Sequence, residues 1–346
     1  MPNQKQTRAQ DIFQPEFQFG LGGVSVGNEF EYVTDEDAHK TLAGSWAAGV
    51  RYYDVSPWYG LGTSERRFGA FLHHKPRDSY VLSTKVGKLL KASPHNKSKE
   101  YFPFANSPND VVFDYTADGV RRSIEDSLQR MGLDRIDVVY VHDISPDNKY
   151  LPRPWEEEFE VALKGAFPTL SKMRDEGIIR GWGMGVNCPQ PLMRVMREAD
   201  PDVCLLASQY SLVDHAKALN ELFPLAREQG VGFVVGSSLN AGFISGSARY
   251  NYGETRWDIP KERIEKRDRL RAVAHQFGVD LRTAALQFSK APDVAVALIV
   301  GARTKDQALK NASSMKDTVP PAFWDELKRQ GLIEQNAPVP AVKSGS

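Results

Sequence analysis

Residues 115–143, YTADGVRRSIEDSLQRMGLDRIDVVYVHD, contain one helix followed by one strand. Apolar side chains recur along its first half at the spacing of one helical face: Val120, Ile124, Leu128 and Met131. Gly132 supplies a residue at which a helix can end in the left-handed conformation. The mainly apolar run 136–141 then predicts a strand that stops at His142. A strand with so few polar positions is typical of a parallel sheet covered by helices.

The same helix–strand alternation extends along most of the chain. Strands are expected near 19–22, 51–55, 80–85, 136–141, 178–186, 203–208, 231–236 and 294–300. Eight such units close naturally into a (β/α)8 TIM barrel. A doubly wound sheet is the rival architecture, but the G-x-G-x-x-G turn that would open it does not occur in this sequence. We therefore expect an α/β barrel.

The expected domain organisation is a single barrel with additions at its ends and one long loop. Residues 1–18 are interpreted as an N-terminal extension, 19–335 as the barrel and 336–346 as a flexible tail. Residues 86–114, after the third strand, break the pattern and are expected to lack regular structure. An insertion of about 28 residues inside a compact domain is more often functional than idle.

The amino-acid composition limits the classes of partner that the protein is expected to bind. The chain has 346 residues, and its 44 Lys and Arg balance its 44 Asp and Glu. This balance argues against a nucleic-acid partner, which usually requires excess positive charge. Cys188 and Cys204 are too few for a disulfide framework and lack metal-ligand spacing. With no apparent signal peptide or membrane span, we expect a cytoplasmic protein with no membrane partner.

Four ionisable side chains are expected to converge at one mouth of the barrel. Asp54, Lys85 and His142 fall at the ends of the second, third and fourth strands, and Tyr59 follows five residues after Asp54. Active sites of this architecture lie where the strands end. A buried ammonium beside a phenol favours the phenolate, and a carboxylate keeps that ammonium charged and oriented. The set can therefore transfer a proton, with His142 bound to the reacting oxygen.

Each of these side chains also has an ordinary structural explanation when taken alone, as a turn cap, an ion-pair partner or a neutral buried imidazole. A second catalytic hypothesis is a metal-dependent hydrolase that uses Asp54, His142 and Asp143. That set is short of the ligands that a catalytic metal needs. The proton-transfer interpretation explains all four residues together.

At this point the sequence resembles the aldo-keto reductase family over about residues 19–315. RYYDVSPWYGLGTSERRFG (51–69), LSTKVG (82–87) and GLDRIDVVYVHD (132–143) are similar to three of its motifs. The resemblance places the family's catalytic tetrad on Asp54, Tyr59, Lys85 and His142. It implies hydride transfer between NAD or NADP and a carbonyl or carbinol carbon, with Tyr59 as proton donor or acceptor and with no metal.

The resemblance also implies a set of cofactor-binding residues, with departures. These residues are Asn187, Tyr210, Ser238, Leu239, Asn240, Gly301, Arg303, Gln307 and Asn311. Asn187 stands where the family usually has Ser, and Ser237 stands where an aromatic residue usually stacks on the nicotinamide. Arg303 and Lys305 are candidate partners of a 2′-phosphate, and both NAD and NADP stay open.

A narrower similarity, carried by residues 113–143 with GMGVN (183–187) and SSLNAG (237–242), is to the D-threo-aldose (L-fucose) 1-dehydrogenase and pyridoxal 4-dehydrogenase branch. It implies oxidation of an aldose or pyridoxal-type cyclic hemiacetal to a lactone. Trp58, Tyr101 and Phe102 are expected to wall this small carbonyl or sugar substrate, although they could equally pack the loop onto the barrel. The alternatives are an NADPH-dependent reductase of aldehydes or ketones and, in another class, a cofactor-binding regulatory subunit.

Overall fold

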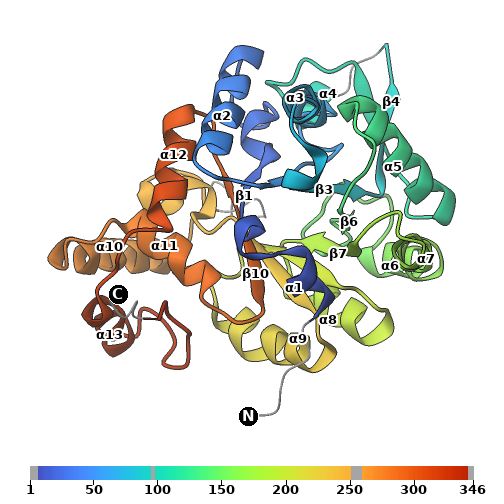
Figure 1. The fold of residues 1–346 in the computed structure, drawn as a ribbon. Helices are drawn as coiled ribbons and strands as arrows, with labels where there is room; N and C mark the ends of the chain where they lie inside the picture. Colours follow the sequence, from blue (N-terminus) through green and yellow to red (C-terminus); the bar gives the residue numbers. More distant parts are fainter. Residues whose placement is uncertain (1–6, 95–97, 251–258, 342–346) are drawn as a thin grey trace.

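The computed structural model describes residues 7–94, 98–250 and 259–341 and shows a closed barrel of parallel strands surrounded by helices (Figure 1). The barrel strands are β1 (Phe19–Gly22), β2 (Tyr52–Asp54), β3 (Val81–Val86), β6 (Val138–His142), β7 (Gly181–Val186), β8 (Val203–Ala207), β9 (Gly232–Gly236) and β10 (Ala295–Gly301). Each pairs with its neighbours in chain order, and β1 closes the ring against β10. The predicted barrel is confirmed, and the doubly wound alternative is wrong.

The outer layer consists of helices that alternate with the strands. They are α2 (Asp35–Ala47), α3 (Thr63–Leu72), α5 (Ala117–Met131), α6 (Trp155–Lys164), α7 (Ala166–Asp175), α8 (Pro189–Glu198), α9 (Phe223–Gln229), α10 (Lys261–Gln276), α11 (Leu281–Lys290), α12 (Lys305–Ser314) and α13 (Pro321–Arg329). A π-helical turn (Ala218–Leu222) leads directly into α9. Among the described helices, none is long and apolar enough to cross a membrane.

Local sequence signals explain where the helices begin and end. The Thr34 hydroxyl accepts a hydrogen bond from the Asp37 N–H at 3.0 Å and caps α2. The Thr116 hydroxyl caps α5 in the same way through the Gly119 N–H. Gly132 ends α5 with φ +63°, which a residue with a side chain adopts only with strain. These two helices therefore follow from side-chain chemistry that is local in the sequence.

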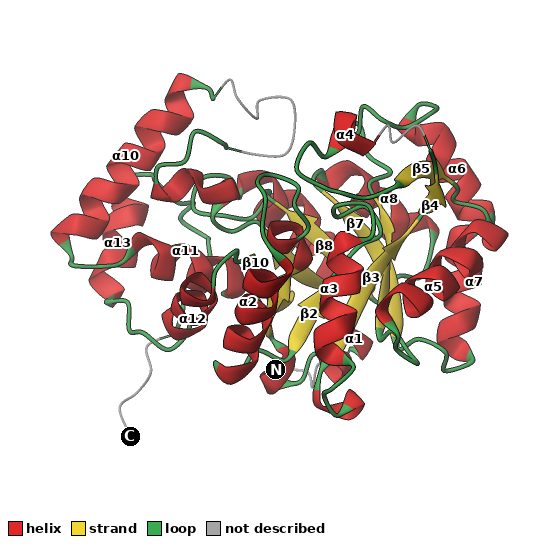
Figure 2. Cartoon of the chain, turned by 90° about the horizontal axis from the view of Figure 1, so that it is seen from above, coloured by secondary structure: helices red, strands yellow, loops and turns green. Residues whose placement is uncertain are grey.

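The described part of the N-terminal segment packs against the barrel core. The short helix α1 (Arg8–Ile12) places Ala9, Ile12 and Phe13 against the side chains inside the barrel, and all three are buried. The Phe13 and Tyr52 rings meet edge to face at 4.9 Å. In Figure 2, α1 lies at one end of the strands and α4 (Ser98–Tyr101) at the other. The helix therefore closes the end of the barrel opposite the long insertion.

The long insertion after β3 is structured, which corrects the prediction that it lacks regular structure. β4 (Lys88–Ala92) and β5 (Asn109–Phe113) form an antiparallel pair, and α4 lies between them. Most side chains on both faces of the pair are partly exposed. The alternating apolar pattern that reveals a half-buried strand is therefore missing from the sequence.

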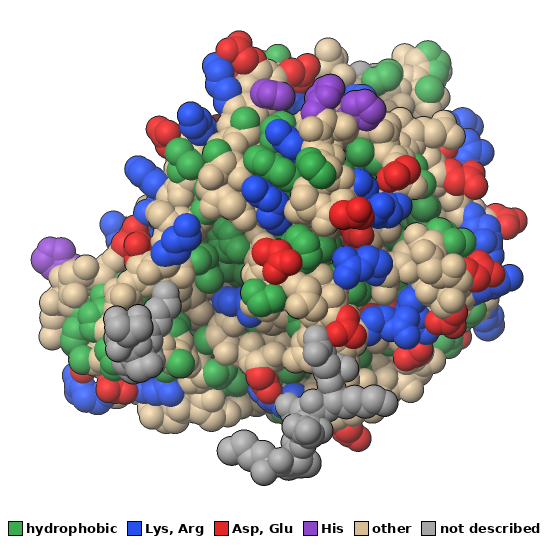
Figure 3. All heavy atoms as spheres, in the orientation of Figure 1, with side chains coloured by type: hydrophobic (Ala, Val, Ile, Leu, Met, Phe, Trp, Pro, Cys, Tyr) green, Lys and Arg blue, Asp and Glu red, His purple; other side chains and the backbone are tan. Residues whose placement is uncertain are grey.

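The predicted flexible tail is packed in its first part. Ala337 is buried, and the Asn336 amide donates to Asn220 Oδ1 at 2.8 Å. Residues 342–346 of that tail, like residues 1–6 of the N-terminal extension, lie outside the described part of the chain. On the face seen in Figure 3, cationic and anionic side chains are interspersed, in keeping with the balanced composition.

Candidate active site

The four predicted catalytic side chains come together at the C-terminal mouth of the barrel. The Lys85 ammonium donates to Asp54 Oδ2 at 2.7 Å and lies 4.6 Å from the centre of the Tyr59 ring. The Tyr59 and His142 rings meet edge to face with centres 5.9 Å apart. Tyr59, Asp54 and His142 line the pocket, whereas Lys85 lies directly beneath Tyr59.

Asp54 and Lys85 form a fully buried ion pair. Ser83 donates its hydroxyl to Asp54 Oδ1 at 2.6 Å, and Lys85 Nζ also donates to the Val55 carbonyl at 3.0 Å. Burial lowers the pKa of Lys85, and the Asp54 carboxylate opposes that shift. A buried pair of this kind is stable only when further hydrogen bonds support both partners, and here Ser83 and the Val55 carbonyl supply them. The pair therefore fixes the position of the Lys85 ammonium under the Tyr59 ring.

His142 is held as a neutral imidazole with a defined tautomer. Ser56 Oγ lies 3.2 Å from His142 Nδ1 and accepts the Trp58 N–H at 3.1 Å. The other nitrogen, Nε2, lies 3.2 Å from Asp143 Oδ2. Because a carboxylate accepts, Nε2 carries the ring proton, and Nδ1 of the neutral ring accepts the Ser56 hydroxyl. Burial, together with the charges of Lys88 and Lys85, lowers the pKa of His142 well below its ordinary value. Sequence reasoning did not find this role of Ser56.

A second charged pair borders the tetrad on the open side of the pocket. Lys88, at the start of β4, donates to Asp143 Oδ2 at 2.5 Å, and its ammonium lies 4.3 Å from the centre of the Trp58 ring. Asp143 has φ +52°, an unusual conformation for a residue with a side chain. Burial raises the pKa of Asp143, and Lys88 opposes that rise. The position of Asp143 directly after the catalytic histidine was the only sequence signal for this pair.

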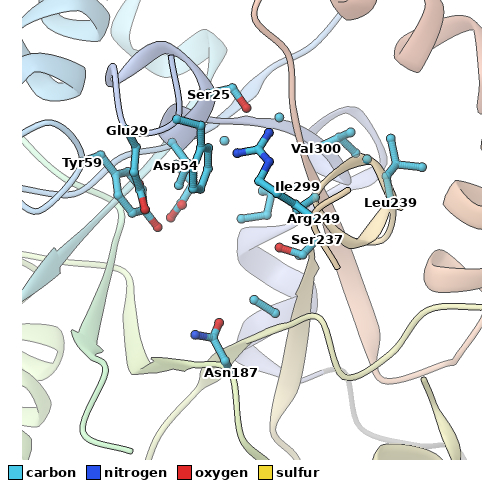
Figure 4. Close-up of a pocket in the computed structure, with 18 of the residues that line it drawn as sticks. Ser25, Glu29, Asp54, Tyr59, Asn187, Ser237, Leu239, Arg249, Ile299 and Val300 are labelled. Carbon is cyan, nitrogen blue, oxygen red and sulfur yellow. The ribbon is translucent and has the colours of Figure 1, made fainter. Parts of the chain in front are cut away.

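These groups face a pocket of about 870 Å³ that continues across the mouth of the barrel. Figure 4 shows Tyr59 and Asp54 on one side, Leu239 and Val300 on the other, and Arg249 between them. The predicted substrate residues Trp58, Tyr101 and Phe102 all line this pocket. Phe102 is also buried against Trp58 with ring centres 4.8 Å apart, so it both walls the pocket and packs the insertion.

The predicted cofactor residues mostly line the far part of the same pocket. Those that do are Asn187, Ser238, Leu239, Gly301, Arg303, Gln307 and Asn311. Gln307 Oε1 accepts the Arg303 N–H at 2.9 Å, and the Asn311 amide donates to the Gly301 carbonyl at 3.3 Å. Hydrogen bonds among predicted cofactor residues therefore hold the start of α12 in place.

Tyr210 does not line the pocket, which corrects its prediction as a cofactor residue. Its ring stacks on Phe288 of α11 with centres 5.2 Å apart and is fully buried. Ser208, with φ +67°, turns the chain after β8, and the Ser289 hydroxyl bonds the Tyr210 carbonyl at 3.1 Å. The ring is consequently part of the layer between barrel and helices.

Asn240 is the second correction. It is fully buried and does not line the pocket, and its N–H already donates to the Ser237 carbonyl at 2.8 Å. The backbone amide of Asn240 is therefore engaged within the turn. Ser238 and Leu239, its predicted companions, do line the pocket.

The far part of the pocket fits a nicotinamide dinucleotide. Ser238 Oγ is buried at the wall and has no hydrogen-bond partner among the described residues. At Gly22, a side chain would meet no atom of the described chain within 4 Å, so the backbone borders open space. Arg249 and Arg303 add positive charge for an anionic ligand. Open backbone, an unused hydroxyl and cations are what a pyrophosphate with its ribose requires.

Asp147 is a further pocket residue that sequence reasoning missed. Its carboxylate accepts hydrogen bonds from the Asn187 amide at 3.1 Å and the Cys188 thiol at 3.2 Å. Burial and the neighbouring carboxylate raise the pKa of Cys188 to about 12, so the thiol stays protonated and donates. Asn187, which departs from the family pattern, and Cys188 are thus joined by one acceptor.

The side chains proposed for a metal-dependent hydrolase have other partners. Asp54 binds Lys85 and Ser83, and His142 binds Ser56 and Asp143. Across the described ranges, no three His, Cys, Asp or Glu side chains gather as a set of metal ligands.

Comparison with known proteins places this chain among enzymes of one family. Residues 18–330 match the Aldo/keto reductase family. The chain is 36% identical to D-threo-aldose 1-dehydrogenase of a Pseudomonas species, over 91% of this chain and 94% of the relative. It is 34% identical to pyridoxal 4-dehydrogenase of Microbacterium luteolum, again over 91% and 94%. Both matches therefore extend over almost the whole of each protein.

A solved structure of an aldo-keto reductase from Bacillus halodurans, in its holo form, superposes with a TM-score of 0.69. The match covers 92% of this chain and 94% of that one, at 22% identity. At this identity the likeness supports the fold.

Proposed function

The chain belongs to the Aldo/keto reductase family and is an NAD(P)-dependent oxidoreductase of carbonyl or alcohol groups; from this premise we propose that it oxidises the cyclic hemiacetal of an aldose to a lactone. The observation that carries the proposal is the tetrad, with Tyr59 held above the buried Asp54–Lys85 pair and beside His142. Residues that wall the rest of the pocket support the choice of a sugar.

In the oxidising direction the chain handles the proton of the reacting hydroxyl. A nicotinamide held by the residues of the far part of the pocket would supply the hydride acceptor for the carbinol carbon. The Tyr59 oxygen takes the hydroxyl proton as the carbonyl forms, and the Lys85 ammonium stabilises the negative charge of the phenolate that receives it. Run in reverse, Tyr59 donates that proton to a carbonyl oxygen.

His142 orients the reacting oxygen through its Nε2–H. Because the Asp143 carboxylate faces Nε2 and the imidazole stays neutral, this nitrogen donates and does not compete for the proton that Tyr59 takes. Asp143 accepts the same N–H when no substrate is present. Substrate must therefore share or replace that contact when it binds.

The proposed substrate class rests on the pocket wall and on the relatives. Trp58, Tyr101 and Tyr150 offer ring faces and edges, and Asp143 and Asp147 offer carboxylates. Carboxylates accept the hydroxyl protons of a sugar, and aromatic faces cover its C–H surface. The relatives at 36% and 34% identity are an aldose dehydrogenase and a pyridoxal dehydrogenase. Pyridoxal is thus the second substrate to test.

We also propose a cytoplasmic enzyme that acts on small molecules. Cys188 and Cys204 are both free thiols in the structure, which supports a reducing compartment.

The test is a panel of substrates with NAD and NADP, measured in both directions, on the wild type and on Tyr59→Phe. We expect an aldose to be oxidised and its methyl glycoside, which lacks the anomeric hydroxyl, to be inert. Tyr59→Phe should lose about 100- to 10,000-fold in kcat, the usual contribution of a general acid–base group. Tyr32→Phe, on a side chain that is 66% exposed, is the matched control.

Several outcomes would contradict the proposal. Turnover of aliphatic aldehydes but not of aldoses would favour the carbonyl reductase. Cofactor binding without turnover of any substrate would favour a regulatory subunit. Full activity in Tyr59→Phe would overturn the role assigned to Tyr59.

A further inference from the structure

Lys88 of the long insertion is buried in the pocket wall beside the catalytic histidine. It is the first residue of β4, it lines the pocket, and only 2% of it is exposed. Its ammonium donates to Asp143 Oδ2 at 2.5 Å and lies 4.3 Å from the centre of the Trp58 ring. Burying a charge is costly unless specific partners compensate it. The proton transfer at Tyr59 does not require this ammonium, so its place in the pocket calls for another explanation.

The contacts of Lys88 complete a ring of five residues that begins and ends at His142. His142 Nδ1 lies 3.2 Å from Ser56 Oγ, and that oxygen accepts the Trp58 N–H at 3.1 Å. The Trp58 ring faces the Lys88 ammonium, which binds Asp143 Oδ2. The same Oδ2 lies 3.2 Å from His142 Nε2. Lys88 is therefore connected to both nitrogens of the catalytic imidazole.

One oxygen of Asp143 faces two donors, Lys88 and His142. The contact with the ammonium is shorter, 2.5 Å against 3.2 Å, and a hydrogen bond between two charged groups is the stronger kind. The backbone of Asp143 is held on both sides, since its N–H donates to the Gly185 carbonyl at 3.0 Å and its carbonyl accepts the Asn148 amide at 2.9 Å. Lys88 thus retains the carboxylate, and the His142 N–H is the partner that a ligand can take over.

Lys88 also supplies charge at this contact. Burial lowers the pKa of His142, and Lys88 and then Lys85 add to that shift. Burial raises the pKa of Asp143, and Lys88 opposes that rise. Because Asp54 compensates Lys85 at 2.7 Å, loss of the Lys88 ammonium would leave Asp143 facing His142 without its counter-charge. The other titratable groups around this contact come from β2 and its loop, from β3 and from the loop after β6: Asp54, Tyr59, Lys85 and Asp147.

We propose that Lys88 is a positioning residue of the reaction, which retains the Asp143 carboxylate so that the Nε2–H of a neutral His142 is available to the reacting oxygen. The proposal rests on the proposed function, and it makes the insertion after β3 part of the active site. Without the ammonium, Asp143 and His142 together would bind a proton more readily. The proton would give either an imidazolium paired with Asp143 or a ring whose Nε2 accepts from it. In both cases Nε2 would no longer donate to the substrate.

The experiment compares the pH profile of kcat/KM for an aldose, at saturating cofactor, in wild type, Lys88→Met and Lys88→Arg. In Lys88→Met the acid limb should move up by about one pH unit or more, because a lost positive charge lets the pair take a proton at higher pH. Lys88→Arg keeps the charge and should keep the limb within about 0.3 pH unit of wild type. Adding Asp143→Asn to Lys88→Met removes the carboxylate as well, so the limb should return toward its wild-type position. A loss of packing alone would not be reversed by a second substitution.

The same change can be followed without substrate in the ¹⁵N shifts of the His142 ring, assigned by their loss in His142→Gln. Between about pH 6 and pH 8 the wild-type ring should stay in its neutral Nε2–H form, because its pKa is held well below the ordinary value. In Lys88→Met the ring should change its protonation or its tautomer within this range. Lys91→Met is the matched control and should behave as wild type, because Lys91 lies on the same strand, is exposed and does not line the pocket.

An acid limb and ring shifts in Lys88→Met that match the wild type would overturn the inference and leave the proposed function standing. Equal changes in Lys91→Met, or a limb in the double variant that stays where Lys88→Met puts it, would also overturn it. A wild type that turns over neither aldoses nor pyridoxal would instead refute the proposed function. The ring shifts alone would then decide whether Lys88 controls His142.

Discussion

At the scale of single residues, the two nitrogens of His142 have different partners and different roles. Ser56 fixes one nitrogen at 3.2 Å, and the other faces Asp143 at the same distance. Asp143 is kept in a left-handed backbone conformation, with φ +52°, while its backbone N–H donates to the Gly185 carbonyl at 3.0 Å. Such a conformation costs of order 1 kcal/mol or more and is concentrated at functional sites. We therefore expect Asp143 to bind substrate.

Asp143→Asn tests this expectation, since Asn keeps the shape and tolerates the same backbone conformation. The substrate loses a charged acceptor for a hydroxyl next to the reacting carbon, so kcat/KM for an aldose should fall by about 10- to 100-fold. For an aldehyde without a neighbouring hydroxyl, the fall should be less than about threefold. Steady-state kinetics on both substrates decide the matter, with the exposed Asp134→Asn as control. Equal losses on both substrates would instead indicate general damage caused by leaving Lys88 without its counter-charge.

The tetrad could be predicted because each member lies at or just after a strand end and the motifs around it are local. Ser56, Lys88 and Asp143 could not be assigned their roles, because their contacts join three separate segments of the chain. Tyr210 was misplaced for the opposite reason. Its motif resembles the family's, but a left-handed turn at Ser208 directs the ring away from the pocket.

At the scale of elements, the turn between β3 and β4 is linked by packing to β6, the strand that ends at His142. Gly87 in this turn has φ +99°, and a side-chain carbon there would lie 2.0 Å from Tyr115 Cε1. The Tyr115 hydroxyl in turn donates to the His142 carbonyl at 2.8 Å. A disturbance at Gly87 is thus transmitted through one buried ring to the backbone of the catalytic histidine.

Gly87→Ala should therefore reduce activity more than its effect on stability explains. Gly132→Ala is the matched variant, because Gly132 also has positive φ but a side chain there meets nothing within 4 Å. Both variants should lose about 1–2 kcal/mol of unfolding free energy from backbone strain. Only Gly87→Ala should also lower kcat by more than about tenfold, because it must displace Tyr115. If kcat is unchanged in both variants, the ring does not position His142.

Helices and barrel strands were predictable as elements, whereas the insertion was not. Thr34, Gly49 and Gly132 mark helix ends by their own chemistry, and the barrel strands are continuous apolar runs. The strands β4 and β5 are stabilised instead by pairing with each other and by packing of Phe102 on Trp58. Contacts of this kind depend on where the barrel places the loop and leave no local periodic pattern.

At the scale of the whole molecule, His215 joins the chain after β8 to the C-terminal segment. Its Nδ1–H donates to the Ser211 carbonyl at 2.9 Å, and Nε2 accepts the Glu334 N–H at 3.1 Å. This pair of contacts requires the neutral imidazole, because a protonated Nε2 would face a donor. Burial accordingly lowers the pKa of His215 to about 4.

The unfolding free energy should therefore fall as the pH is lowered from about 6.5 to about 4. In this pH window His215 of the unfolded chain, with a pKa near 6.5, binds a proton, whereas His215 of the folded chain stays neutral. Acid therefore favours unfolding. The folded pKa of about 4 implies a loss of up to about 3 kcal/mol from this residue. Urea unfolding of wild type and His215→Gln across this range checks it, and the variant should show a clearly smaller pH slope. His142 contributes in the same direction, so some slope remains. Identical slopes would contradict the assignment.

The closure of β1 on β10 has a consequence for the order of events during synthesis. Phe19 pairs in register with Leu298, so the two edges of the barrel meet across some 280 residues of chain. A ribosome must release β10 before β1 has its second neighbour, and Ala9, Ile12 and Phe13 can seal the interior only when Val296 and Ile299 are present. Contacts between such distant segments form late in folding. Residues near the N-terminus, although synthesised first, are thus among the last to reach their native packing.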